Sequence, residues 1–108
     1  MAVRSDSGVQ QPDQAGLERD LGELESGLRQ LENDYTMFFA GRRQRPPVAL
    51  RARMEAILRR WDRVSVERST ERFRFNTLQL RFRSFASLWD RGFRAREEGR
   101  PGPFSTRV

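Results

Sequence analysis

Cysteine, histidine and lysine are all missing from this sequence of 108 residues. Without cysteine and histidine the chain forms no disulfide, offers no thiolate or imidazole ligand to a metal ion, and has neither side chain for catalysis. All 21 basic residues are therefore arginine. Exclusive use of arginine is typical of GC-rich coding, but it also supplies planar guanidinium groups that bind carboxylates and phosphates through paired hydrogen bonds.

Long apolar runs and enzyme motifs are missing as well. The sequence has no stretch of about 20 apolar residues that would cross a membrane, and its N-terminus lacks the apolar core of a signal peptide. It contains no P-loop, no glycine-rich nucleotide fingerprint and no serine nucleophile motif. We therefore expect a cytoplasmic protein that is not an enzyme, needs no cofactor or metal, and has no small-molecule substrate.

Two long apolar stripes with helical spacing are present instead. Steps of three and four residues place the members of each stripe on one face of an α-helix, and the first stripe keeps the alternation of a helix–helix seam. Both stripes end in aromatic residues. The first consists of Leu17, Leu21, Leu24, Leu28, Leu31, Tyr35 and Phe38, and the second of Phe75, Leu78, Phe82, Phe85, Trp89 and Phe93.

Local signals divide the chain into three helices and two tails. Glycine follows the first and third helices, and proline opens the second. The predicted helices span residues 14–40, 47–62 and 69–98. Residues 1–13 and 99–108 have no apolar period, so we predict disordered tails there. The chain is thus predicted to form one helical domain over residues 14–98.

The predicted fold is all-α. The two long helices, 14–40 and 69–98, are predicted to pair antiparallel as a coiled-coil-like hairpin, because their apolar stripes match in length. The short helix 47–62 braces this pair. Residues 72–75 alternate arginine and phenylalanine as a strand would, but Leu78 breaks the alternation, which favours helix. The antiparallel layers would set Leu17 and Leu21 against Trp89 and Phe93, and Tyr35 and Phe38 against Phe75 and Leu78.

Charge is distributed unevenly along the chain. Residues 1–40 contain 3 arginines and 8 acidic residues, a formal charge of −5, whereas residues 41–108 contain 18 arginines and 7 acidic residues, a charge of +11. An acidic first helix beside a basic later helix would form favourable rim pairs. The candidate surface for an anionic partner comprises Arg42, Arg43, Arg45, Arg51, Arg53, Arg59, Arg60 and Arg63. For the first three, the alternative is that they stabilise the C-terminus of the first helix and bind no partner, because cations are favourable there.

The third predicted helix has a second apolar strip. Phe73 and Leu80 lie nearly opposite its main stripe, and a helix with two apolar faces is either packed between two neighbours or contributes to an interface. We therefore treat this pair as a candidate helix interface. Arginine also alternates with aromatics at 72–75, as on nucleic-acid platforms, although on a helix such aromatics are core and the arginine stems cover them. Asn76 either fixes the register through a buried hydrogen bond or faces solvent.

Four short segments stand out: YTMFFAG at 35–41, RPP at 45–47, RFRFNTLQ at 72–79 and LWDR at 88–91. They resemble an uncharacterised myxobacterial (deltaproteobacterial) C-terminal domain family. The likeness covers roughly residues 17–98, and its most specific string is Arg-Phe-Asn-Thr-Leu at 74–78. The resemblance implies a helical domain and a myxobacterial origin, and it transfers no functional residues.

The sequence favours one function and leaves a second open. The first is a non-catalytic helical module for protein–protein interaction or scaffolding, with a protein partner or self-association. The alternative is an arginine-rich module that associates with nucleic acid or the ribosome, because the charge of residues 41–108 suits a phosphate backbone.

Overall fold

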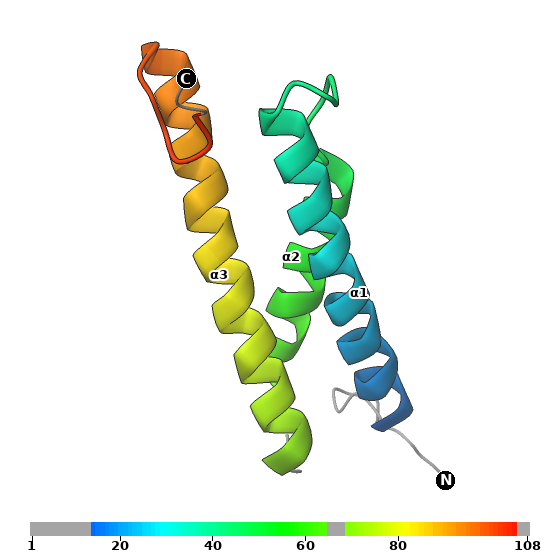
Figure 1. The fold of residues 1–108 in the computed structure, drawn as a ribbon. Coiled ribbons are helices and arrows are strands. Elements are labelled where there is room, and N and C mark those ends of the chain that lie inside the picture. Colours follow the sequence, from blue (N-terminus) through cyan, green and yellow to red (C-terminus); the bar gives the residue numbers. More distant parts are fainter. Residues whose placement is uncertain (1–13, 65–68, 106–108) are drawn as a thin grey trace, which may run out of the picture.

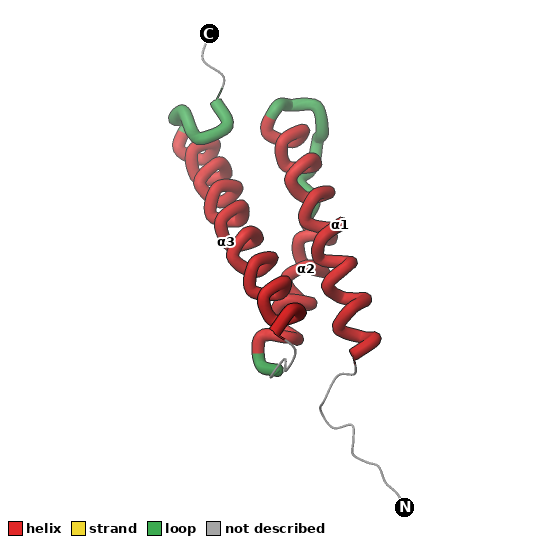
Figure 2. Tube along the Cα trace, turned by 60° about the horizontal axis from the view of Figure 1, so that its bottom comes forward, coloured by secondary structure: helices red, strands yellow, loops and turns green. Residues whose placement is uncertain are grey.

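The computed structural model describes residues 14–64 and 69–105, and this part of the chain contains three helices. α1 spans Gln14–Phe39, α2 spans Val48–Asp62 and α3 spans Ser69–Glu98. Figures 1 and 2 show them side by side as a bundle. The predicted all-α fold is confirmed: two long helices are in contact, and the shorter helix packs against α1. The segment 72–75 is helical, as predicted.

α1 and α3 run parallel, so the predicted antiparallel direction was wrong. Near the start of both helices, Nη1 of Arg74 donates to Oε1 of Glu18 at 3.1 Å. Near their ends, the rings of Tyr35 and Trp89 stack with centroids 4.2 Å apart. Figure 1 shows the N-terminal ends of both helices at the bottom.

The predicted layers between the two long helices are therefore reversed. Tyr35 and Phe38 meet Trp89 and Phe93, with ring centroids 4.2 and 5.7 Å apart, rather than Phe75 and Leu78. Leu17 and Leu21 lie at the opposite end of α1, at the level where Glu18 meets Arg74, and not against Trp89 and Phe93.

α2 explains the parallel direction. Trp61 near its end donates to Asp20 near the start of α1, and Arg51 near its start reaches the hydroxyl of Tyr35 near the end of α1. α2 therefore carries the chain back along the bundle, and α3 begins at the same end as α1. Matched stripe length does not distinguish the two directions, because a heptad pattern fits a parallel partner as well as an antiparallel one.

The core contains both predicted stripes and the apolar face of α2. All seven members of the first stripe are buried, and in the second stripe Phe85 and Phe93 are partly buried while the other four are buried. Gly27 lets α2 approach α1 closely, because a Cβ at this position would overlap Sδ of Met54. α2 adds Met54, Ile57, Leu58 and Trp61 to the core.

Glycine ends both long helices, as predicted. Gly41 has φ of +80° and Gly99 has φ of +66°, a left-handed conformation that glycine adopts without strain. In the turns that follow the helices, Arg42 N–H donates to the carbonyl of Met37 at 2.9 Å, and Arg100 N–H to that of Ala95, also at 2.9 Å.

Residues 99–105 fold back against the end of α3, where the sequence predicted a disordered tail over 99–108. The ring of Phe104 stacks on Phe39, the last residue of α1, with centroids 4.3 Å apart. The predicted tail 1–13 and the last residues, 106–108, lie outside the described residues. None of the described helices is both long and apolar enough to span a membrane.

Candidate interaction surfaces

Arg51, one of the eight candidate arginines, lies between the helices. Its Nη1 and Nη2 donate to the two carboxylate oxygens of Asp90 on α3 at 3.0 and 3.2 Å, and Nη1 also lies 3.4 Å from the Tyr35 hydroxyl. Its guanidinium carbon lies 5.8 Å from the centroid of the Trp89 ring. Burial lowers the pKa of Arg51, but hydrogen bonds to Asp90 and Tyr35 outweigh burial and raise it. Arg51 therefore joins all three helices.

Three more candidates pair with carboxylates of α1. Ion pairs with an exposed arginine contribute at most about 1 kcal/mol each, but they compensate the charge that an anionic partner would meet. One of these carboxylates, Asp20, also accepts a buried hydrogen bond from Nε1 of Trp61 at 2.7 Å. The pairs are Arg43 with Asp34 at 3.6 Å, Arg53 with Glu23, and Arg60 with Asp20 at 3.7 Å.

The remaining four candidates form no ion pair within residues 14–64 and 69–105. Arg42 and Arg45 lie in the loop after α1, whereas Arg59 and Arg63 lie near the C-terminal end of α2. At 1.5 Å per residue, the two groups are separated by roughly 15–20 Å along α2. The eight candidates therefore do not form one continuous basic surface.

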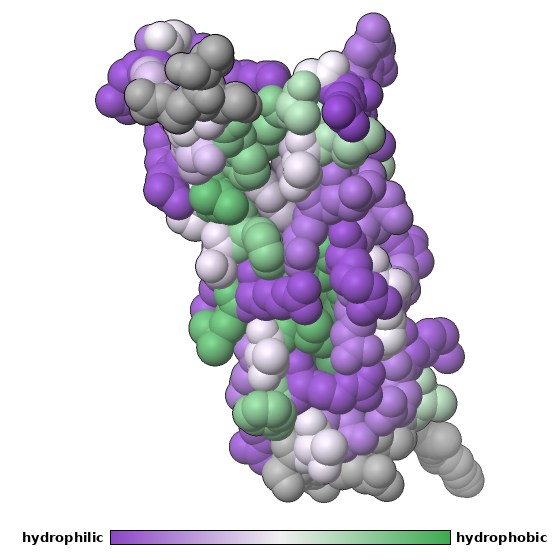
Figure 3. Space-filling model, in the orientation of Figure 1, coloured by the Kyte–Doolittle hydropathy of each residue, from purple (hydrophilic) through white to green (hydrophobic). Residues whose placement is uncertain are grey.

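A row of ion pairs lines the edge between α1 and α3. Arg74 reaches Glu18 and Glu25 at 3.1 Å each, and Arg81 reaches Glu32 at 2.8 Å. The hydrogen bond to Glu25 is the main cause that raises the pKa of Arg74. Figure 3 shows hydrophilic residues over the lower part of this edge and hydrophobic residues over its upper part. The acidic first helix and the basic third helix thus form the rim pairs that the charge distribution predicted.

The outer face of α3 carries the two candidate interface residues. Phe73 is 72% exposed and Leu80 is 65% exposed. Asn76 is also exposed, so it faces solvent and fixes no register in the core. Figure 3 shows hydrophobic residues at the lower left edge, over α3. We call this face the outer strip; its exposed members are Phe73, Asn76, Thr77, Leu80, Ser84 and Ser87.

Arginines lie beside the outer strip, and Asp62 of α2 lies near one side of it, where Nε2 of Gln79 donates to Oδ1 of Asp62 at 3.1 Å. Arg72 and Arg83 are exposed beside it, and neither forms an ion pair within the described residues. Glu71 is buried, and the next acidic residue along α3 is Asp90. On α3 itself, the charged residues from Arg72 to Arg83 are therefore all positive.

No protein family model matches the chain, and no curated protein or solved structure matches it. The resemblance to the myxobacterial family therefore stays a prediction. Among the described residues, no group of three or more acidic side chains is placed to hold a metal ion. Function has to be inferred from the surfaces of the bundle.

Two features of these surfaces escaped the sequence analysis. Arg51 looks like its neighbours in the sequence, and only the parallel packing brings Asp90 to it. Phe104 lies in a segment rich in proline and glycine, and such a composition predicts disorder. Its single aromatic residue was the one available signal that the segment packs against something.

Proposed function

We propose that this protein is a non-catalytic interaction module that binds an amphipathic partner helix on the outer strip of α3. The exposure of Phe73 and Leu80, at 72% and 65%, carries the proposal. The two residues are seven positions apart, about two helical turns, so both side chains project from the same side. A helix of a monomeric bundle normally has polar residues on that side, and large exposed apolar side chains favour an interface.

The outer strip has the dimensions of a helix-docking site. From Phe73 to Ser87 it extends roughly 21 Å along α3, enough for four turns of a partner helix. The positions between the two anchors, and those after them, are small or uncharged, such as Thr77 and Ser84. Small residues let two helix backbones approach closely, and anchors two turns apart suit recognition of an amphipathic helix.

The charges beside the strip favour an acidic partner. Arg72 and Arg83 form no ion pair within the described residues, although Glu55 and Asp62 line the same groove as Arg83. Acidic residues beside the apolar stripe of a partner would pair with these arginines. A second copy of this chain fits less well. Two outer strips packed together would bring the arginines of both copies toward each other, and like charges across an interface are unfavourable.

The test uses a designed probe, because no natural partner is identified. The probe is a dye-labelled helical peptide with leucines two turns apart and glutamates on the flanks, and its matched control has lysines in place of the glutamates. We expect the full chain to raise the fluorescence anisotropy of the glutamate peptide only. Phe73→Ser with Leu80→Ser should weaken binding at least tenfold, because both anchors are lost.

Val48 offers a matched control variant. It is also 65% exposed, but it lies at the start of α2, away from the outer strip. Val48→Ser removes an exposed apolar side chain of the same kind and should leave binding unchanged. Equal loss in both variants, or equal binding of the two peptides, would refute the proposal. Sedimentation across concentration separates the second-copy version, which would give dimers that depend on Phe73 and Leu80.

Nucleic-acid binding is the second candidate. The observation in its favour is that Arg59 and Arg83, which form no ion pair within the described residues, line one groove of about 370 Å³ between α2 and α3. Glu55 and Asp62 line the same groove and would repel phosphate. This mixture of charge is the reason that we place nucleic acid second.

A gel shift with generic RNA and DNA at two salt concentrations tests the second candidate. Binding through phosphate contacts should weaken steeply as salt rises. Arg59→Ala with Arg83→Ala should abolish the shift, whereas Arg42→Ala, Arg43→Ala and Arg45→Ala together test the loop after α1. Absence of any shift of wild-type protein at low salt dismisses nucleic acid as the partner.

A further inference from the structure

The edge between α1 and α3 changes from charged to apolar residues along its length. Every seventh residue of α1 along this edge is glutamate until the last turn, where it is phenylalanine. Every seventh residue of α3 along the same edge is first arginine and then leucine and alanine. Seven residues are close to two helical turns, so these positions recur on the same side of each helix. The two series are Glu18, Glu25, Glu32 and Phe39, and Arg74, Arg81, Leu88 and Ala95.

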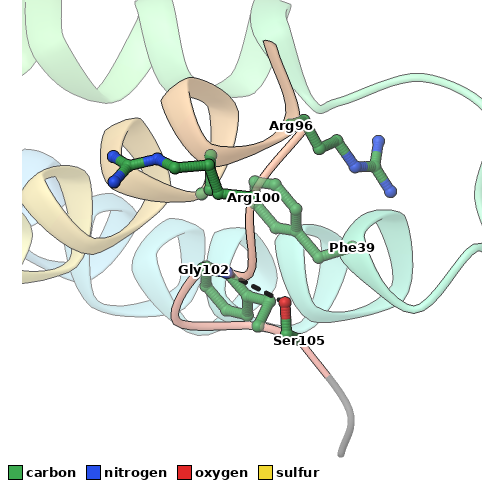
Figure 4. Close-up of a pocket in the computed structure, with 8 residues that line it drawn as sticks. Phe39, Arg96, Arg100, Gly102 and Ser105 are labelled. Carbon is green, nitrogen blue, oxygen red and sulfur yellow. Dashed lines mark hydrogen bonds between the residues drawn. The ribbon is translucent and has the colours of Figure 1, made fainter. Parts of the chain in front are cut away.

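The chain's own C-terminal segment covers this apolar end. After the turn at Gly99 the chain folds back, and the ring of Phe104 lies parallel to that of Phe39, with centroids 4.3 Å apart and an interplanar angle of 4°. Figure 4 shows Gly102 and Ser105 in the returning loop, close to Phe39. We call residues 101–105 the cover segment.

Directly beneath the cover segment, α3 presents Gly92 and Ala95, and Arg96 also lines the site, with its guanidinium carbon 5.3 Å from the centroid of the Phe39 ring. A Cβ on Gly92 would lie 2.8 Å from Cζ of Phe39 and 2.9 Å from Cδ2 of Phe104, so both rings rest on the bare backbone. A Cβ on Gly102 would lie 2.5 Å from Cβ of Ala95, so the cover segment passes directly over α3. A cavity of about 100 Å³ remains between these residues. This end of α3 therefore has room for a peptide backbone and a ring.

Within the described part of the chain, no hydrogen bond joins the cover segment to α1. Gly102 N–H donates to Oγ of Ser105 at 2.9 Å, and Ser105 N–H donates to the carbonyl of Gly102 at 3.0 Å, so both bonds lie inside the segment. Its tie to α1 is the ring stack on Phe39. The segment can leave by giving up one aromatic contact and its packing on α3, because its hydrogen bonds move with it.

We propose that this end of α1 and α3 is a binding site for a peptide that presents a phenylalanine after proline and glycine, and that the cover segment occupies this site within the chain. A partner peptide of the same chemistry takes the site when the cover segment leaves. The ring lies on Phe39 and Gly92, and the preceding backbone crosses Ala95. The site lies apart from the two anchors of the outer strip, since Gly92 lies roughly 18 Å along α3 from Leu80.

The probe is a dye-labelled peptide with the sequence of residues 99–108, and the receptor is the full chain with Phe104→Ala. We expect this variant to bind the peptide with a dissociation constant of about 100 μM, because the cover segment stays docked only if that constant is below the millimolar effective concentration of a short tether. Wild-type protein should bind about tenfold more weakly, because its own segment competes. A peptide with alanine in place of its phenylalanine should not bind.

Further variants keep the result interpretable. Adding Ala95→Arg to Phe104→Ala should block the peptide without disturbing the helices, which circular dichroism verifies. Adding Phe73→Ser and Leu80→Ser instead should leave peptide binding unchanged, so failure of this site and failure of the outer strip are distinguishable. Concentration-dependent dimers of wild type that need Phe104 would support the site and identify a second copy as the source of the peptide.

Two results would overturn the proposal. Equal binding of the peptide by wild type and by Phe104→Ala would show that the cover segment does not compete for the site. No binding by the folded Phe104→Ala variant at millimolar peptide would show that no such site exists.

Discussion

Replacing Phe82 with alanine should cost far more stability than the same change at Phe73, nine residues earlier on the same helix. Phe82 is 7% exposed and packs edge-on against Trp89 with centroids 6.2 Å apart, whereas Phe73 is 72% exposed. Truncating a buried phenylalanine costs about 3–5 kcal/mol, since transfer free energy is lost and a cavity remains. Phe73 gives up only about a quarter of its transfer term, which the higher helix propensity of alanine offsets.

The expected difference is large enough for a thermal melt. Unfolding entropy is about 2.1 cal/mol/K per residue, so a domain of about 90 residues loses roughly 5 °C in Tm for each kcal/mol. Phe82→Ala should therefore melt roughly 16–26 °C below wild type, and Phe73→Ala within about 3 °C of it. The assay is circular dichroism at the helical band, because Phe82 touches Trp89 and would alter its fluorescence. Equal melting of the two variants would mean that the buried face of α3 is assigned incorrectly.

Two further predictions concern close contacts in the bundle. Gly27→Ala should destabilise by about 1–2 kcal/mol despite the better helix propensity, because its Cβ overlaps the buried Met54, whereas Gly22→Ala has nothing within 4 Å and should stabilise by about 0.5–1 kcal/mol. Urea unfolding measures both, and the same sign for the pair would contradict the close approach of α2. Trp61→Phe removes the donor 2.7 Å from the buried carboxylate of Asp20 and should cost about 1–3 kcal/mol; a cost below about 0.5 kcal/mol would mean that this hydrogen bond contributes little.

The sequence predicts the elements of this fold better than their arrangement. The stripe from Leu17 to Phe38 is buried throughout, and Gly41 adopts the left-handed turn expected after a helix. Spacing and turn chemistry are local properties, so the sequence carries them directly. The direction of α3 is not local. It depends on α2 running the full way back along α1, and a short apolar stretch does not reveal which end of a long neighbour it reaches.

The candidate surfaces divide in the same way. The wheel position of Phe73 and Leu80 opposite the main stripe predicted a second apolar strip, but it left open whether a neighbouring helix would cover that strip. The arginines were harder, because a guanidinium beside a distant carboxylate looks like any other in the sequence. Arg51 was grouped with a basic surface, yet it pairs with Asp90, which lies 39 positions later in the chain.

The parallel pairing of α1 and α3 also sets the order in which the chain completes its fold. A contact between α1 and α2 joins Tyr35 and Arg51, which are only 16 residues apart in sequence. The contacts between α1 and α3 join residues farther apart in sequence, 49 residues for Glu32 with Arg81 and 56 for Glu18 with Arg74. Closing the longer loops costs more chain entropy and slows folding. During synthesis from the N-terminus, α2 can therefore cover its side of α1 first, whereas the edge with Glu18, Glu25 and Glu32 stays open to solvent until α3 has been made as far as Arg74 and Arg81.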